Sequence, residues 1–98
     1  MKMADSEGMQ TRPQPQYGIV KDQQSLGHLL REHRRHKELT LKTFYQSSGI
    51  TTRFMSELER GKIASIGRLL RVLNMLGLEL VVLQRAQAGR LMSRHSRA

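Results

Sequence analysis

The sequence predicts a compact all-α domain of four to five helices, followed by a single β-strand. Apolar residues recur at spacings of three and four across residues 25–77, which is the period of an amphipathic helix. Side chains suited to helix N-caps precede four such stretches: Ser25, Thr40, Thr51 and Ser65. Residues 78–83, LELVVL, are β-branched in the middle and carry apolar residues on both faces, as a short strand does.

The composition allows one small domain with a basic surface. The chain has 98 residues, of which 38% are hydrophobic, and its 17 Lys and Arg against 8 Asp and Glu give a net charge of +9. Residues 25–84 alone carry ten basic and five acidic side chains, so the excess is not confined to the termini. A basic folded part favours a polyanionic partner, most often nucleic acid.

Several classes of function have no support in the sequence. The chain has no cysteine, which excludes disulfides and thiolate metal sites. Its four histidines include no HExxH pattern, and ERGKIAS does not match a phosphate-binding loop. No apolar run approaches the ~18 residues that span a bilayer, and the N-terminus lacks the apolar core of a secretory signal. We therefore expect a cytoplasmic protein that is not an enzyme and has no catalytic residues, cofactor, metal, small-molecule substrate or membrane partner. The basic folded part adds the expectation that it is nucleoid-associated.

Composition divides the chain into four segments. Residues 1–24 are polar, with two prolines set among glutamines, and are predicted to be a disordered arm. Residues 25–77 form the folded domain and residues 78–84 the strand. Residues 85–98 are small, polar and basic, and are predicted to be a flexible tail.

The first two helices follow from their caps and apolar faces. Ser25 caps a helix that ends near Glu38, with one apolar face: Leu26, Leu29 and Leu30. Thr40 caps a shorter helix that runs to Ser48, with its own apolar stripe: Leu41, Phe44 and Tyr45.

The stretch SSGITTRFMSELERGK predicts a sharp turn and a third helix. Gly49 suits the positive φ of the turn, and Thr51 caps a helix that ends at Gly61. Three residues point inward: Ile50, Met55 and Leu58. The opposite face is polar: Thr52, Arg53, Ser56, Glu57 and Arg60.

The polar face of this third helix has two interpretations. Two helices joined by a short turn are typical of a helix-turn-helix, in which the second helix enters the major groove. Arg53 can then pair with guanine and Glu57 can accept from cytosine, while the serine and threonine hydroxyls suit bases or phosphates. A solvated helix surface is the alternative.

The fourth helix leads directly into the strand. Ser65 caps it, Gly77 ends it, and five residues are expected inward: Ile66, Leu69, Leu70, Leu73 and Leu76. A lone strand exposes unpaired backbone donors and acceptors, so it needs a partner. The same strand of a second protomer can supply one across a two-fold axis. The residues expected at this homodimer interface are Leu78, Leu80, Val81, Val82 and Leu83. Pairing with Ile19 and Val20 is the alternative.

Residues 25–77 resemble a Cro/C1-type helix-turn-helix domain of the XRE family. LTLKTFYQSSGITTRFMSELERGK stands where the family shows the pattern LTQxxLAxxxGVSxxxISxxExGK. The positions that fit are Leu39, Thr40, Phe44, Gly49, Ile50, Thr51, Met55, Ser56, Glu59, Gly61 and Lys62, and Leu58 stands at a position that the pattern leaves open. The following LLRVLNMLGLELVVLQR is similar to the end of HipB-like antitoxins, in which the fourth helix runs into a strand that joins its dimer mate.

The resemblance implies a role for individual residues. The expected base contacts are Thr51, Thr52, Arg53, Ser56 and Glu57. The expected contacts to the DNA backbone are Thr40, Lys42, Arg60 and Lys62. Glu59 is expected to form a structural ion pair with an arginine of the first helix, Arg34.

Two positions depart from the family pattern. Leu41 replaces a glutamine that grips a phosphate, which removes one expected backbone contact. Tyr45 replaces a small alanine where two helices cross closely, so the ring either separates the helices or turns its hydroxyl to solvent or phosphate.

The resemblance implies a sequence-specific repressor that acts as the antitoxin of a toxin–antitoxin module. Such a protein binds a pseudo-palindromic operator as a homodimer and restrains a HipA-type serine/threonine kinase toxin. A stand-alone XRE regulator and a protein-bridging transcription adaptor are the alternatives, since the same fold serves both.

Overall fold

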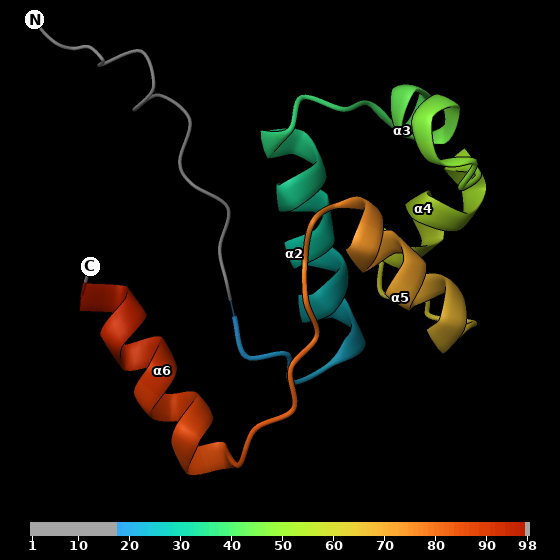
Figure 1. Ribbon diagram of the computed structural model, residues 1–98. Coiled ribbons are helices and arrows are strands. Elements are labelled where there is room, and N and C mark those ends of the chain that lie inside the picture. Colours follow the sequence, from blue (N-terminus) through green and yellow to red (C-terminus); the bar gives the residue numbers. More distant parts are fainter. Residues whose placement is uncertain (1–17, 98) are drawn as a thin grey trace, which may run out of the picture.

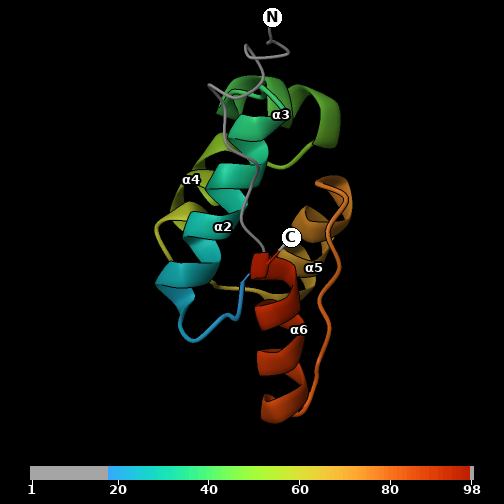
Figure 2. The ribbon, with the colours of Figure 1, turned by 90° about the vertical axis from the view of Figure 1, so that its left-hand side faces the viewer.

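The chain is all-helical over the residues that its computed structural model describes, 18–97. Five helices occur in this range: α2 (Gln23–His36), α3 (Leu41–Ser48), α4 (Thr52–Glu59), α5 (Ile66–Met75) and α6 (Arg85–Arg97) (Figure 1). The predicted all-α class is therefore confirmed. Helix α4 packs against both α2 and α3. Helix α6 lies at the end of the molecule remote from α3 in both views (Figures 1 and 2).

Helix α2 begins earlier than predicted. Its N-cap is Asp22, whose Oδ1 accepts a hydrogen bond of 2.7 Å from the Ser25 amide. The Ser25 hydroxyl in turn accepts from the Asp22 amide, at 3.3 Å, which completes a capping box. The prediction of Ser25 as the N-cap was wrong because serine also serves at the third position of this box. Helix α2 thus starts inside the predicted disordered arm, and residues 1–17 of that arm lie outside the described residues.

The other three predicted caps are confirmed. In each helix the cap hydroxyl accepts from the amide three residues later: Thr40 from Thr43 at 3.0 Å, Thr51 from Phe54 at 3.1 Å, and Ser65 from Arg68 at 3.2 Å. These bonds satisfy amides that have no partner within a helix.

The core lies between α2, α3, α4 and α5. Its buried apolar residues are Leu30, Phe44, Ile50, Met55, Leu58, Leu69, Val72, Leu73 and Leu76. The inward positions predicted around α4, namely Ile50, Met55 and Leu58, are confirmed. The prediction that Ile66 and Leu70 of α5 point inward is wrong, since Ile66 is 62% exposed and Leu70 is also exposed. Both lie at the edge of the stripe formed by Leu69, Val72, Leu73 and Leu76, where no other helix covers them.

Glycine allows α2 and α4 to approach closely. A Cβ on Gly27 would lie 2.6 Å from the carbonyl oxygens of both Leu58 and Glu59, which is closer than atoms pack. At the end of α4, Gly61 is buried with φ at +91°, and a Cβ there would lie 3.1 Å from Gln24 Cα. The N-terminal half of α2 therefore rests on the backbone at the end of α4.

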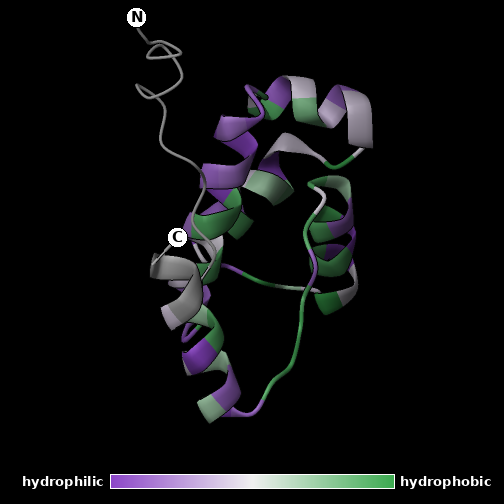
Figure 3. Ribbon diagram, turned by 60° about the vertical axis from the view of Figure 1, so that its left-hand side comes forward, coloured by the Kyte–Doolittle hydropathy of each residue, from purple (hydrophilic) through white to green (hydrophobic). Residues whose placement is uncertain are grey.

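Residues 78–84 connect α5 to α6 without forming a strand. Neither Ile19 nor Val20 pairs with them, since residues 18–97 contain no β-strand. Leu78 packs against the core, whereas Val82 is 90% exposed and its apolar neighbours are exposed as well. Figure 3 shows this connection as mostly apolar, interrupted by a hydrophilic stretch. A strand is formed by hydrogen bonds to a neighbour, and the single chain supplies no neighbour here.

The predicted flexible tail is instead helical. Arg85–Arg97 form α6, which contradicts the prediction for residues 85–98. The prediction gave most weight to the polar, basic composition. Good helix formers such as Ala86, Ala88, Leu91 and Met92, with no proline among them, favour the helix.

Replacing Gly27 by alanine is expected to destabilise the fold. The added methyl group would meet two backbone carbonyl oxygens, so α2 and α4 must separate, at a cost of about 1–3 kcal/mol or more. Urea denaturation followed by circular dichroism measures the change. Gly67→Ala is the control, because nothing lies nearer than 3.8 Å and alanine favours a helix, and a gain of up to about 1 kcal/mol is expected. Equal stability of the two variants would contradict the close approach.

Candidate nucleic-acid interface

The turn between α3 and α4 is a compact hydrogen-bonded unit. Gly49 takes a left-handed conformation with φ at 78°, and its amide donates to the Tyr45 carbonyl at 2.8 Å. The buried Ser48 hydroxyl donates to the Phe44 carbonyl at 2.6 Å and accepts from the Ile50 amide at 3.0 Å. The direction in which α4 leaves α3 is therefore set by bonded backbone groups.

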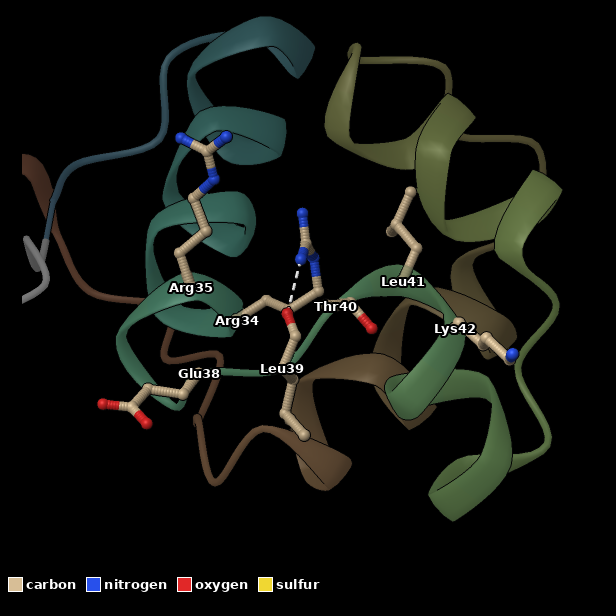
Figure 4. Close-up of a pocket in the computed structure, with 7 residues that line it drawn as sticks. All are labelled: Arg34, Arg35, Glu38, Leu39, Thr40, Leu41 and Lys42. Carbon is tan, nitrogen blue, oxygen red and sulfur yellow. Dashed lines mark hydrogen bonds between the residues drawn. The ribbon is translucent and has the colours of Figure 1, made fainter.

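A buried ion pair joins α4 to α2, as the sequence resemblance implied. Arg34 donates to Glu59 through Nε at 2.6 Å and through Nη2 at 3.0 Å, in a bidentate arrangement. The two side chains are only 8% and 6% exposed. Nη1 of Arg34 donates at 2.6 Å to the Leu39 carbonyl, in the connection to α3 (Figure 4). One guanidinium group thus contacts α4 and the α2–α3 connection together.

The five residues expected to read bases all lie at the start or along the outward side of α4. Thr51, Thr52 and Arg53 are exposed, and Ser56 and Glu57 are half-buried. Because α4 buries Met55 and Leu58 on its other side, these polar groups share one surface.

The polar groups on this surface pair with one another along the helix. Arg53 Nε lies 3.5 Å from Glu57 Oε2, and Arg60 donates to the Ser56 hydroxyl at 2.9 Å. Arg53 is nevertheless 88% exposed. Exposed pairs of this spacing contribute only a few tenths of a kcal/mol, so an incoming acceptor can displace them.

The residues expected at the DNA backbone flank this surface. Thr40 and Lys42 are exposed at the start of α3, and Lys62 is exposed just after α4. The Thr40 hydroxyl is engaged in the capping box with Thr43, at 3.1 Å between the two hydroxyl oxygens. The side chain of Lys42 is therefore the more available group at this helix end.

A shallow hollow lies between the end of α2 and the start of α3. Figure 4 shows the residues that line it: Arg34, Arg35, Glu38, Leu39, Thr40, Leu41 and Lys42. Because Glu59 balances the charge of Arg34, the excess positive charge of this lining comes from Arg35 and Lys42 against Glu38, beside the first amides of α3.

The two departures from the family pattern have distinct outcomes. Leu41 is half-buried and packs against the core, so it adds apolar contact where the family pattern has a glutamine. Tyr45 is 47% exposed, so its ring is not wedged between buried side chains of α3 and α4.

Two contacts from α5 were not anticipated from the sequence. Arg71 Nη2 donates to the Ser48 carbonyl at 2.9 Å, and the Arg68 guanidinium lies 5.5 Å from the ring centre of Phe54. No role was predicted for either arginine. Their partners lie 23 and 14 residues away in the chain, and the periodicity of one helix does not predict contacts between residues so far apart.

Residues 18–97 hold no group of three or more His, Cys, Asp or Glu side chains arranged to bind a metal ion. Within the same range, every helix is too short or too polar to cross a lipid bilayer. No family model and no curated protein matches the chain.

Glu59→Ala is expected to destabilise the fold by about 3–5 kcal/mol, because it leaves the Arg34 charge buried without its partner. Glu57→Ala is the matched control. It removes the same group from the neighbouring exposed pair, and a loss below about 1 kcal/mol is expected. Urea denaturation of both variants measures the difference. A loss for Glu59→Ala as small as that of the control would mean that the buried pair contributes little to the fold.

Proposed function

We propose that the chain is an XRE-type helix-turn-helix protein that binds DNA sequence-specifically as a homodimer and represses transcription. The observation that carries this proposal is the outward surface of α4. It gathers hydroxyl, guanidinium and carboxylate groups on one rigid helix, which the Arg34–Glu59 pair holds against α2. A buried charge pair beneath a polar, exposed helix surface favours contact with DNA bases as the role of this surface, over that of an ordinary solvated helix surface.

The chemistry of this surface suits the edges of base pairs. The Arg53 guanidinium can donate two parallel hydrogen bonds to guanine, and the Glu57 carboxylate can accept from the cytosine amino group. In the free protein these two groups face each other at 3.5 Å, and DNA binding exchanges that weak contact for base contacts. Thr51, Thr52 and Ser56 add hydroxyl groups that donate or accept.

The flanking cations suit the DNA backbone. Lys42 and Lys62 lie on either side of the α4 surface in the chain and are exposed, and Thr40 lies at the first amides of α3. Helix N-termini attract phosphates through their free amides and their dipole. Arg60 reaches the same side through its contact with Ser56.

The proposed dimer forms through residues 78–84. Leu80, Val81, Val82 and Leu83 are exposed on an extended connection, and its backbone forms no ladder within residues 18–97. Pairing with the same segment of a second copy would satisfy the backbone and cover these side chains. A two-fold dimer matches a pseudo-palindromic operator.

The proposed partner is a HipA-type serine/threonine kinase toxin. The proposed location of this chain is the cytoplasm, at the nucleoid, where it would bind DNA. The likeness of LLRVLNMLGLELVVLQR to the end of HipB-like antitoxins supports this part of the proposal. A stand-alone regulator and a bridging adaptor are the competing functions. The test is to express a kinase gene that lies beside this one and to measure growth. Growth arrest that co-expression of this chain relieves would favour the antitoxin. Growth arrest that persists would favour one of the two competing functions.

Arg53→Ala is expected to relax specificity at one base pair and to cost about 1–3 kcal/mol on a preferred duplex. Lys62→Ala should weaken binding to all duplexes alike, because a phosphate contact carries no sequence information. The preferred duplex is first selected from a random library, and fluorescence anisotropy then compares it with random DNA. Equal losses on both duplexes for both variants would refute the assignment of α4 as the reading helix.

Val82→Lys is expected to shift the protein from dimer to monomer without unfolding it. Because Val82 is 90% exposed within one chain, any effect on the monomer fold is small, whereas a charge inside the paired strand is costly. Sedimentation equilibrium measures the shift. Leu91→Lys, at an exposed position of α6, serves as the control and should leave the dimer intact. A wild-type monomer at micromolar concentration, or an unchanged dimer for Val82→Lys, would rule out this interface.

A further inference from the structure

The end of α3 is capped by a residue from another helix. The last carbonyl groups of a helix have no partner within it, and its C-terminal end attracts a cation. Helix α3 has no basic residue in its last turn. Arg71 of α5 supplies one, with its Nη2 atom 2.9 Å from the Ser48 carbonyl oxygen.

The Arg71 guanidinium also lies against the turn itself. Its Nη2 atom is 3.8 Å from the position that a Cβ on Gly49 would occupy. Within the same turn, the Ser48 hydroxyl accepts a hydrogen bond from the Ile50 amide at 3.0 Å. The residues that set the direction of α4 are thus held by two contacts, one from Ser48 and one from Arg71.

Helix α5 contacts the beginning of α4 as well. Arg68, one helical turn before Arg71, places its guanidinium 5.5 Å from the centre of the Phe54 ring. Phe54 belongs to the first turn of α4, next to Arg53. Both arginines of α5 therefore act on the same junction, and a charge-assisted bond to a carbonyl is the stronger of the two contacts.

We infer that Arg71 is a positioning residue for base reading. By capping α3 at Ser48, it fixes the angle of α4 and so the place of Arg53 at the base edges, without touching DNA itself. This inference rests on the proposed function of α4. Loss of the cap loosens the turn, and the contacts most sensitive to that movement are the directional ones to bases rather than those to phosphates.

The test compares Arg71→Met with Arg31→Met. Each removes one positive charge from an exposed residue, but Arg31 lies within α2 and caps no helix end among the described residues. Both are measured by anisotropy on the selected duplex and on random DNA, at a temperature where circular dichroism shows each variant to be folded. Arg71→Lys is added because it keeps a cation and a donor near the Ser48 carbonyl. Hydrogen exchange of the Gly49 and Ile50 amides reports on the turn directly.

Arg71→Met is expected to lose about tenfold or more in affinity for the selected duplex, equivalent to weakening one base contact. Its affinity for random DNA should fall no more than that of Arg31→Met. Exchange at Gly49 and Ile50 should accelerate, and Arg71→Lys should restore part of the lost specificity. If Arg71→Met does not fold, the affinities of Arg71→Lys for the selected duplex and for random DNA are compared with those of the wild-type protein instead.

Two results would overturn the inference. One is a specificity ratio for Arg71→Met equal to that of Arg31→Met, which would reduce Arg71 to a surface charge. The other is unchanged exchange at the turn. Failure of the proposed function looks different, because the wild-type protein would then select no preferred duplex, while amide exchange would still report the capping role of Arg71.

Discussion

The arrangement of the helices depends on the buried ion pair between Arg34 and Glu59. Two charges removed from water must meet each other with good geometry, since burial without a partner costs several kcal/mol. The bidentate contact meets that requirement, and the third bond of the guanidinium, to the Leu39 carbonyl, extends it to the α2–α3 connection. The pair therefore constrains where α4 lies relative to α2 far more narrowly than apolar contacts alone would.

The close approach at Gly27 makes this geometry possible. Only a residue without a side chain lets the carbonyls of Leu58 and Glu59 rest on α2, which brings Glu59 within reach of Arg34. At its other end, α4 is held by the turn at Gly49 and by the two arginines of α5. The backbone of α4 is thus held at both ends, while the Arg53–Glu57 pair on its surface is weak.

Much of the fold and of the candidate site follows from local patterns. Caps at Thr40, Thr51 and Ser65, and the inward positions of Ile50, Met55 and Leu58, depend on spacing within one helix, so the sequence predicts them correctly. The Arg34–Glu59 pair was anticipated through family resemblance rather than spacing. Two of the errors, at the start of α2 and in α6, occur where two local solutions compete. Asp22 and Ser25 both suit a cap, and α6 combines helix formers with a composition typical of mobile tails.

The sequence by itself determined the all-α class, the turn at Gly49 and the polar surface of α4, because each depends on residues within a few positions of one another. Only the tertiary structure decided that Gly27 meets the end of α4, that Arg71 caps α3, and that Ile66 and Leu70 stay exposed. These depend on which helix lies next to which. Which helices become neighbours depends on side-chain volume and on the partners available to buried charges. The periodicity along one helix predicts neither of them.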